Sequence, residues 1–155
     1  MFRIFLFLSL ILFAYALILP VYADKPDLIG IMALLGGWMV ALNDIPTAIS
    51  WLANVTFFFA IVMILKRKKP RPVAALVFSI LSIALACAIL GAGKIVTGAT
   101  TSQTVGKLAI GTAFYAWVGS FVLMAVASWL KMKSLKPSAS AAPVQETVAS
   151  TTAKS

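Results

Sequence analysis

The sequence contains no histidine, one cysteine and only four acidic residues among 155. Cys87 has no second cysteine to pair with, so an intramolecular disulfide is excluded. Zinc and haem are held mainly by cysteine and histidine side chains, so we expect neither metal nor cofactor. The absences also remove imidazole and paired-thiol chemistry, and we expect that the protein is not an enzyme.

Apolar residues are abundant: 62% of the chain is hydrophobic and only 11% is charged. Soluble domains are typically about half apolar and about a quarter charged. A small soluble fold has too little interior to hide this much apolar surface from water. The composition therefore predicts an all-α integral membrane helical bundle. We expect three to four transmembrane helices plus one short re-entrant or interfacial segment.

The net charge of +9 is concentrated beside apolar runs. Five of the thirteen cations lie within residues 66–71, and three more are Lys131, Lys133 and Lys136. Cations that flank membrane spans are typical of cytoplasmic loops. We therefore interpret the charge as a determinant of membrane orientation, and we expect no binding of nucleic acid.

The first 23 residues fit two interpretations. Ile4 to Leu19 is an apolar run that follows Arg3, which is typical of a first transmembrane helix. The same residues resemble a cleavable signal peptide, with Val21-Tyr22-Ala23 as the cleavage site. Both interpretations place Asp24 outside the cytoplasm. The predicted domains are thus residues 1–23, a membrane helical domain over 24–133 and a disordered cytoplasmic tail over 134–155.

Two apolar stretches follow. The number of crossings that places the basic run in the cytoplasm decides which of them crosses the bilayer. Leu28 to Leu42 would cover only about 22 Å as a helix, against a hydrocarbon core of about 30 Å. Thr47 to Leu65 is long enough to span, and Asp44 or Thr47 is expected to cap it. If both stretches crossed, the basic run would be exported, against the positive-inside rule. We predict that Leu28–Leu42 does not cross.

The remaining chain is predicted to contain two further spans, Val73–Ala92 and Leu108–Leu130, joined by a polar connection over 93–107. With this topology, ten cations lie on the inner side and three on the outer side. We therefore predict a multi-pass protein of the bacterial inner membrane, within the cell membrane, with a cytoplasmic C-terminus.

The candidate site is an outer-side contact cluster of Asp24, Asp27, Asn43 and Asp44. Their oxygen atoms are suited to a hard cation. The same residues are favoured in turns and helix caps, and we favour that interpretation over a metal site. Asn54 and Thr56 lie just inside an apolar run. They are candidates for lining a polar path, but we favour a hydrogen bond to a neighbouring helix as their role.

The words Gly36-Gly37-Trp38 and Ser50-Trp51-Leu52-Ala53-Asn54 precede a span and a basic loop. Over residues 30–130 this pattern resembles small multi-pass bacterial inner-membrane proteins of uncharacterised function. The resemblance implies a membrane location and no reaction.

Because no chemistry was found, we expect an accessory, assembly or interaction subunit. Its partners would be the lipid bilayer and a larger membrane protein or a second copy of the chain. Two alternatives are a holin-like or pore-forming permeabilising protein and a small-solute channel or transporter. The absence of ionisable residues from the long apolar runs disfavours coupled transport.

Overall fold

The computed structural model describes residues 1–23, 25–42, 44–66, 70–92, 94–97, 104–107 and 109–135. Helices account for most of these residues. The helices are α1 (Phe2–Ile18), α2 (Gly30–Ala41), α3 (Ile45–Leu65), α4 (Pro72–Cys87), the short 3₁₀ helix η1 (Ala88–Ala92) and α5 (Thr112–Leu135). The strands are β1 (Pro20–Tyr22), β2 (Lys25–Ile29), β3 (Lys94–Thr97) and β4 (Thr104–Lys107).

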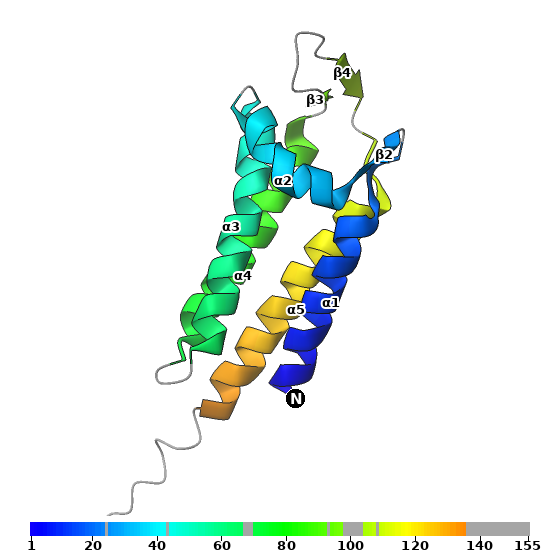
Figure 1. Ribbon diagram of the computed structural model, residues 1–155. Helices are drawn as coiled ribbons and strands as arrows, with labels where there is room; N and C mark the ends of the chain where they lie inside the picture. Colours follow the sequence, from blue (N-terminus) through cyan, green and yellow to red (C-terminus); the bar gives the residue numbers. More distant parts are fainter. Residues whose placement is uncertain are drawn as a thin grey trace, which may run out of the picture.

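Four long helices run side by side along the molecule (Figure 1). Helix α1 packs along α5, α3 packs along α4, and α4 also contacts α5. The chain passes from one end to the other in α1 and returns in α3. It crosses again in α4 and returns in α5, so the start of α1 and the end of α5 lie together (Figure 1).

The two ends of the bundle differ in structure. One end, which we call the hairpin end, carries the antiparallel pairs β1–β2 and β3–β4 together with α2. Helix α2 lies obliquely across this end and contacts α3 and α1 (Figure 1). The opposite end, which we call the basic end, carries the helix termini next to Arg3, Lys66, Arg71 and Lys133.

Helix α2 starts where the chain turns back against α1. The Gly30 backbone N–H donates to the Leu19 carbonyl at 3.0 Å. A Cβ at Gly30 would lie 2.2 Å from the Ala16 carbonyl oxygen, so the close approach of the two backbones requires glycine. This contact fixes the start of α2 beside the end of α1.

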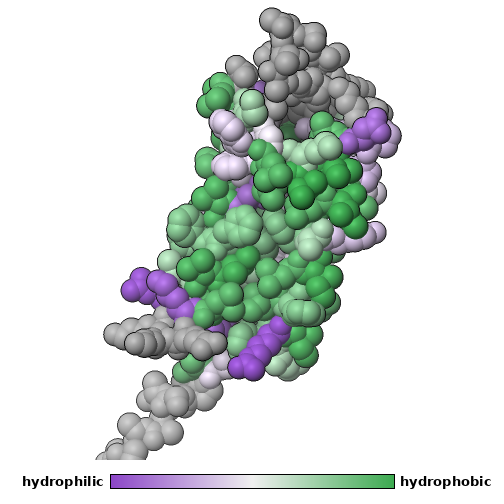
Figure 2. All heavy atoms as spheres, in the orientation of Figure 1, coloured by the Kyte–Doolittle hydropathy of each residue, from purple (hydrophilic) through white to green (hydrophobic). Residues whose placement is uncertain are grey.

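The exterior of the bundle is apolar, and several small polar side chains lie in its interior beside the apolar core. Ser9, Ser79, Ser120 and Ser128 are fully buried, whereas large apolar side chains cover the outer faces of the helices. Figure 2 shows this apolar surface over the length of the bundle, with hydrophilic residues near its ends. The buried hydroxyls bond to helix carbonyls; the Ser9 hydroxyl on α1, for example, donates to the Ser120 carbonyl on α5 at 2.7 Å.

The predicted helical fold is confirmed. Three described helices are long and apolar enough to cross a membrane: Ile45–Leu65, Pro72–Gly91 and Thr112–Leu135. The sequence did not predict the strands. Lys25–Ile29 is a strand that includes the expected start of the 28–42 stretch, and the 93–107 connection contains β3 and β4. The last span begins at Thr112 and not at Leu108, because residues before it extend into a β-bridge between Ile110 and Tyr22.

Candidate functional site

A cavity of about 350 Å³ lies at the hairpin end, between α2 and the long helices. This volume is at the lower end of the range for small-molecule sites. Its walls are mostly apolar and come from α1, β1, β2, α2, α3, η1, α5 and the residue Ile110 that precedes α5. The lining residues are Ala16, Leu17, Val21, Tyr22, Leu28, Gly30, Met32, Ala33, Leu34, Gly36, Gly37, Met39, Thr47, Ser50, Trp51, Asn54, Ile89, Ile110, Ala113, Phe114 and Trp117.

Trp51 holds α2 over the cavity. Its indole Nε1 donates to the Leu34 carbonyl of α2 at 3.0 Å. A Cβ at Gly37 would lie 2.7 Å from Cδ1 of the same indole. Gly37 therefore makes room for the ring that anchors its helix. At neighbouring Gly36, which also lines the cavity, a Cβ would meet nothing within 4 Å.

Asn54 connects two helices at the cavity wall. The Trp117 indole Nε1 on α5 donates to Asn54 Oδ1 on α3 at 2.8 Å. Asn54 Nδ2 donates in turn to the Trp51 carbonyl at 3.2 Å. The side chain is only 6% exposed, so this pairing satisfies an amide that would be costly to bury alone. The predicted role of Asn54, a hydrogen bond to a neighbouring helix, is confirmed.

Thr56 makes the equivalent link between α3 and α4. Its hydroxyl oxygen lies 2.7 Å from the Ser82 hydroxyl oxygen, and one of the two hydroxyls donates to the other. The hydroxyl that accepts is then the one that donates to a carbonyl of its own helix. Thr56 does not line the cavity. It is a packing contact, as expected for a polar residue in an apolar run.

An aromatic stack closes the bundle beyond the cavity. Phe57 lies 4.9 Å from Phe13 and 4.8 Å from Phe121, measured between ring centroids. Phe57 and Phe121 are fully buried. These rings lie one helical turn further toward the basic end than Asn54 and Trp117. The cavity therefore ends on a packed core.

Of the acidic residues described at the hairpin end, Asp44 has a structural role. Asp44 caps α3: its side chain accepts from the Thr47 backbone N–H at 2.9 Å and from the Thr47 hydroxyl. Pro46 lies in the first turn, so the predicted cap is confirmed. Asp27 is exposed on β2.

The predicted cluster is only partly visible, because Asp24 and Asn43 lie outside the described residues. Within the described ranges, no three histidine, cysteine or acidic side chains are placed to hold a metal ion.

Tyr22 lines the cavity and is influenced by the charge of Asp44, the residue that caps α3. Burial raises the pKa of its phenol above the ordinary value of 10.0, and the negative charge of Asp44 raises the same pKa further. The neutral phenol is therefore the stable form beside the cavity.

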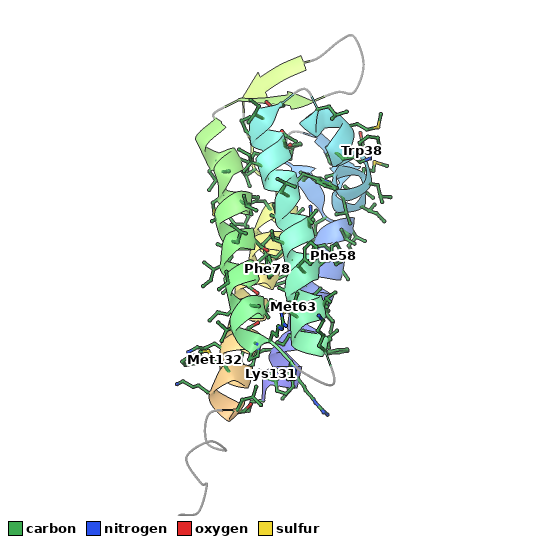
Figure 3. The ribbon with its side chains drawn as sticks, turned by 90° about the vertical axis from the view of Figure 1, so that its left-hand side faces the viewer. Trp38, Phe58, Met63, Phe78, Lys131 and Met132 are labelled. Atoms are coloured by element: carbon green, nitrogen blue, oxygen red, sulfur yellow. The ribbon has the colours of Figure 1, made fainter. Side chains whose placement is uncertain are left out.

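Lys131 organises the opposite end of the molecule. Its ammonium group donates to the Ile64 carbonyl in the last turn of α3. The same nitrogen lies 4.9 Å from the centroid of the Phe2 ring at the start of α1. Figure 3 shows Lys131 at the basic end and Trp38 of α2 at the hairpin end. A lysine from α5 thus joins three helices by a carbonyl bond and a cation–π contact.

The chain matches no protein-family model, no curated protein and no solved structure. Asn54 was predicted from the sequence to bond to a neighbouring helix, whereas its partner Trp117 and the cavity were not predicted. The sequence feature that could have indicated the site is the presence of two tryptophans in apolar runs, Trp51 in the same run as the buried Asn54 and Trp117 in the last run.

Proposed function

We propose that the chain is a multi-pass membrane protein that acts by binding other molecules, as an accessory, assembly or interaction subunit, and not by catalysis. The membrane assignment is supported mainly by the exposed apolar exterior and by the buried serines. Phe7, Leu35 and Val77 are 65%, 68% and 58% exposed, while Ser79 and Ser120 are fully buried. Such an exterior suits lipid, and internally bonded hydroxyls suit a helix bundle that has no water to satisfy them.

We infer four crossings, by α1, α3, α4 and α5. Helix α1 has 17 residues, which corresponds to about 25 Å, and it runs beside the longer α5. Helix α2 has 12 residues and lies at the hairpin end, which suits an interfacial or re-entrant segment. We assign the basic end to the cytoplasm of a bacterial inner membrane, because its cations follow the positive-inside rule.

The packing of α1 supports its retention in the mature protein. Leu6, Phe13 and Ala16 are buried, and Phe13 stacks on Phe57 in the middle of the bundle. Removal of residues 1–23 would expose this core and delete part of the cavity wall. The intact mass of the protein purified from membranes tests the point: a mass that begins at Ala23 or Asp24 would contradict retention.

A binding role is favoured over conduction because the bundle interior is filled. The Phe13, Phe57 and Phe121 stack occupies the position that a solute path would need. In proteoliposomes loaded with a small fluorescent dye, the purified chain should cause no release above that of empty vesicles. Rapid dye release would favour the pore-forming alternative.

In-cell photocrosslinking tests for a partner. A benzophenone amino acid is placed at Val77 or Ile80 on α4, and at Phe7 or Ile11 on α1, all of which are exposed apolar positions. A partner that docks on one face gives a discrete protein adduct from one helix and none from the other. Lipid adducts alone from all four positions would contradict the subunit role.

A further inference from the structure

We propose that the cavity beneath α2 binds a neutral lipid whose carbonyl-bearing head lies beside Asn54. This site is separate from the outer helix faces on which a protein partner would dock. The inference rests on the proposed membrane location, because the ligand enters from the bilayer. Two classes of lipid have the required chemistry, a quinone and an acylglycerol. Both are uncharged, largely apolar molecules that carry a carbonyl oxygen.

The described lining favours an uncharged ligand. None of the described residues that line the cavity is acidic or basic. An ionised head in such surroundings would be desolvated without a counter-charge, which is strongly unfavourable. The pKa of Tyr22 is raised, so this lining residue is neutral as well. A phosphate head would remain outside.

The apolar walls define the body of the ligand. Four aromatic side chains contribute to the lining: Tyr22, Trp51, Phe114 and Trp117. Aromatic rings present flat apolar faces that stack on planar groups and pack against chains. Met32 and Met39 add flexible walls on the α2 side, which adapt to ligands of irregular shape.

Asn54 provides a polar anchor that is nine-tenths buried. A carboxamide carries two N–H donors and two acceptor lone pairs. The described contacts use one donation, to the Trp51 carbonyl, and one acceptance, from Trp117 Nε1. In the proposed complex, the second N–H of Asn54, which lines the cavity, donates to the carbonyl oxygen of the ligand. The contacts with the Trp117 indole and the Trp51 backbone carbonyl hold the amide in a fixed orientation, which lowers the entropic cost of binding.

The test uses the full chain purified in detergent, with decylubiquinone and dioleoylglycerol as neutral probes and dioleoylphosphatidylglycerol as the charged one. Native mass spectrometry counts bound molecules. Quenching of tryptophan fluorescence follows the quinone, because Trp51 and Trp117 line the cavity. We expect one neutral molecule per chain. Binding of the charged lipid alone, or of no probe, would overturn the proposal; the responding neutral probe identifies the class.

Gly36→Leu is the variant that reduces the volume of the cavity. A side chain at this position starts in open space, and leucine is a better helix former than glycine, so folding is preserved. We expect loss of the bound neutral lipid. Gly91→Leu is the matched control, because a Cβ there also meets nothing within 4 Å and Gly91 does not line the cavity. Undiminished binding by Gly36→Leu would contradict the site.

Asn54→Leu tests the anchor, since leucine has a similar size and no donor. Binding should weaken roughly 2- to 10-fold, the effect of one hydrogen bond. Equal affinity would show that Asn54 does not contact the ligand. Alkaline carbonate extraction of membranes is run in parallel. A chain that stays in the membrane yet binds no neutral lipid disproves this inference alone, whereas a chain that is extracted disproves the membrane assignment.

Discussion

The hairpin end and the basic end are formed by the same long helices, yet they differ in how tightly they pack. Toward the basic end, Ile64, Met124 and Ala127 are fully buried, and Lys131 joins α5 to α3 and α1. Toward the hairpin end, the helices separate around a cavity of about 350 Å³ that α2 covers. Met32 and Leu35 on α2 are 58% and 68% exposed.

The difference locates stability in one region and binding in the other. Residues in a close-packed core unfold only with the whole structure, whereas elements with few buried contacts open locally at lower free energy. Helix α2 is held mainly by the Trp51 contact and by the close approach at Gly30. We therefore expect ligands and conformational change at the hairpin end, and global stability from the middle and the basic end.

The largest expected effect is in the aromatic stack. Phe57→Ala should lower the free energy of unfolding by about 3–5 kcal/mol, because a fully buried ring leaves a cavity behind. Thermal unfolding in detergent, followed by circular dichroism, measures the loss. Phe7→Ala, at a ring that is 65% exposed, should change stability far less. Equal losses would mean that the stack is not the core of the fold.

The second prediction concerns the anchor of α2. Gly37→Ala places a Cβ 2.7 Å from the Trp51 ring, and overpacking of this kind typically costs about 1–3 kcal/mol. Gly36→Ala, at the adjacent open position, should be neutral or stabilising by up to about 1 kcal/mol. Unfolding free energies and limited proteolysis of α2 compare the two variants. The same response from both would remove Trp51 as the anchor.

The third prediction separates the two described acids of the hairpin end. Asp44→Ala removes the cap of α3 and should cost about 1 kcal/mol of unfolding free energy. Asp27→Ala, at an exposed strand position, should change stability by less than about 0.5 kcal/mol. Denaturant unfolding resolves this difference. If Asp27→Ala proved the more harmful, the acids would have a shared role beyond capping.

The smallest effect is a dependence on alkaline pH. The pKa of Tyr22 is raised in the folded state, first by burial and then by Asp44, so folding favours the protonated phenol. The associated stability is complete below the ordinary tyrosine pKa of about 10 and declines as pH rises through the raised value. Tyr22→Phe should flatten the fall in melting temperature above pH 10. Tyr115→Phe, at a side chain that is 67% exposed, is the control and should keep the wild-type decline.

Several elements could be predicted from sequence because their signals are local. The Asp44 cap and Pro46 mark the start of α3, and an apolar run of helical length follows. Asn54 could be assigned a hydrogen bond because an isolated amide in an apolar run needs a partner. These inferences depend on neighbouring residues and not on the path of the chain.

The strands and the cavity depend on distant residues and could not be predicted in the same way. Strands β3 and β4 have four residues each, and they exist only because they pair with each other. The cavity arises from the oblique placement of α2, which Gly30 and Trp51 determine through contacts with α1 and α3. Trp117 is 63 positions away from Asn54 in the sequence, and a single sequence does not reveal that the two side chains are in contact.

The most direct test of the account is the side of the membrane on which α2 begins and ends. Single cysteines at Ala23, Leu42 and Lys66 are introduced into a Cys87→Ser background and treated with an impermeant thiol reagent in intact cells. We predict labelling at Ala23→Cys and Leu42→Cys, and labelling at Lys66→Cys only after permeabilisation. Labelling of Ala23→Cys and Leu42→Cys from opposite sides would mean that α2 crosses the bilayer. That result would contradict the four-crossing topology and the placement of α2 as a non-crossing helix over the cavity.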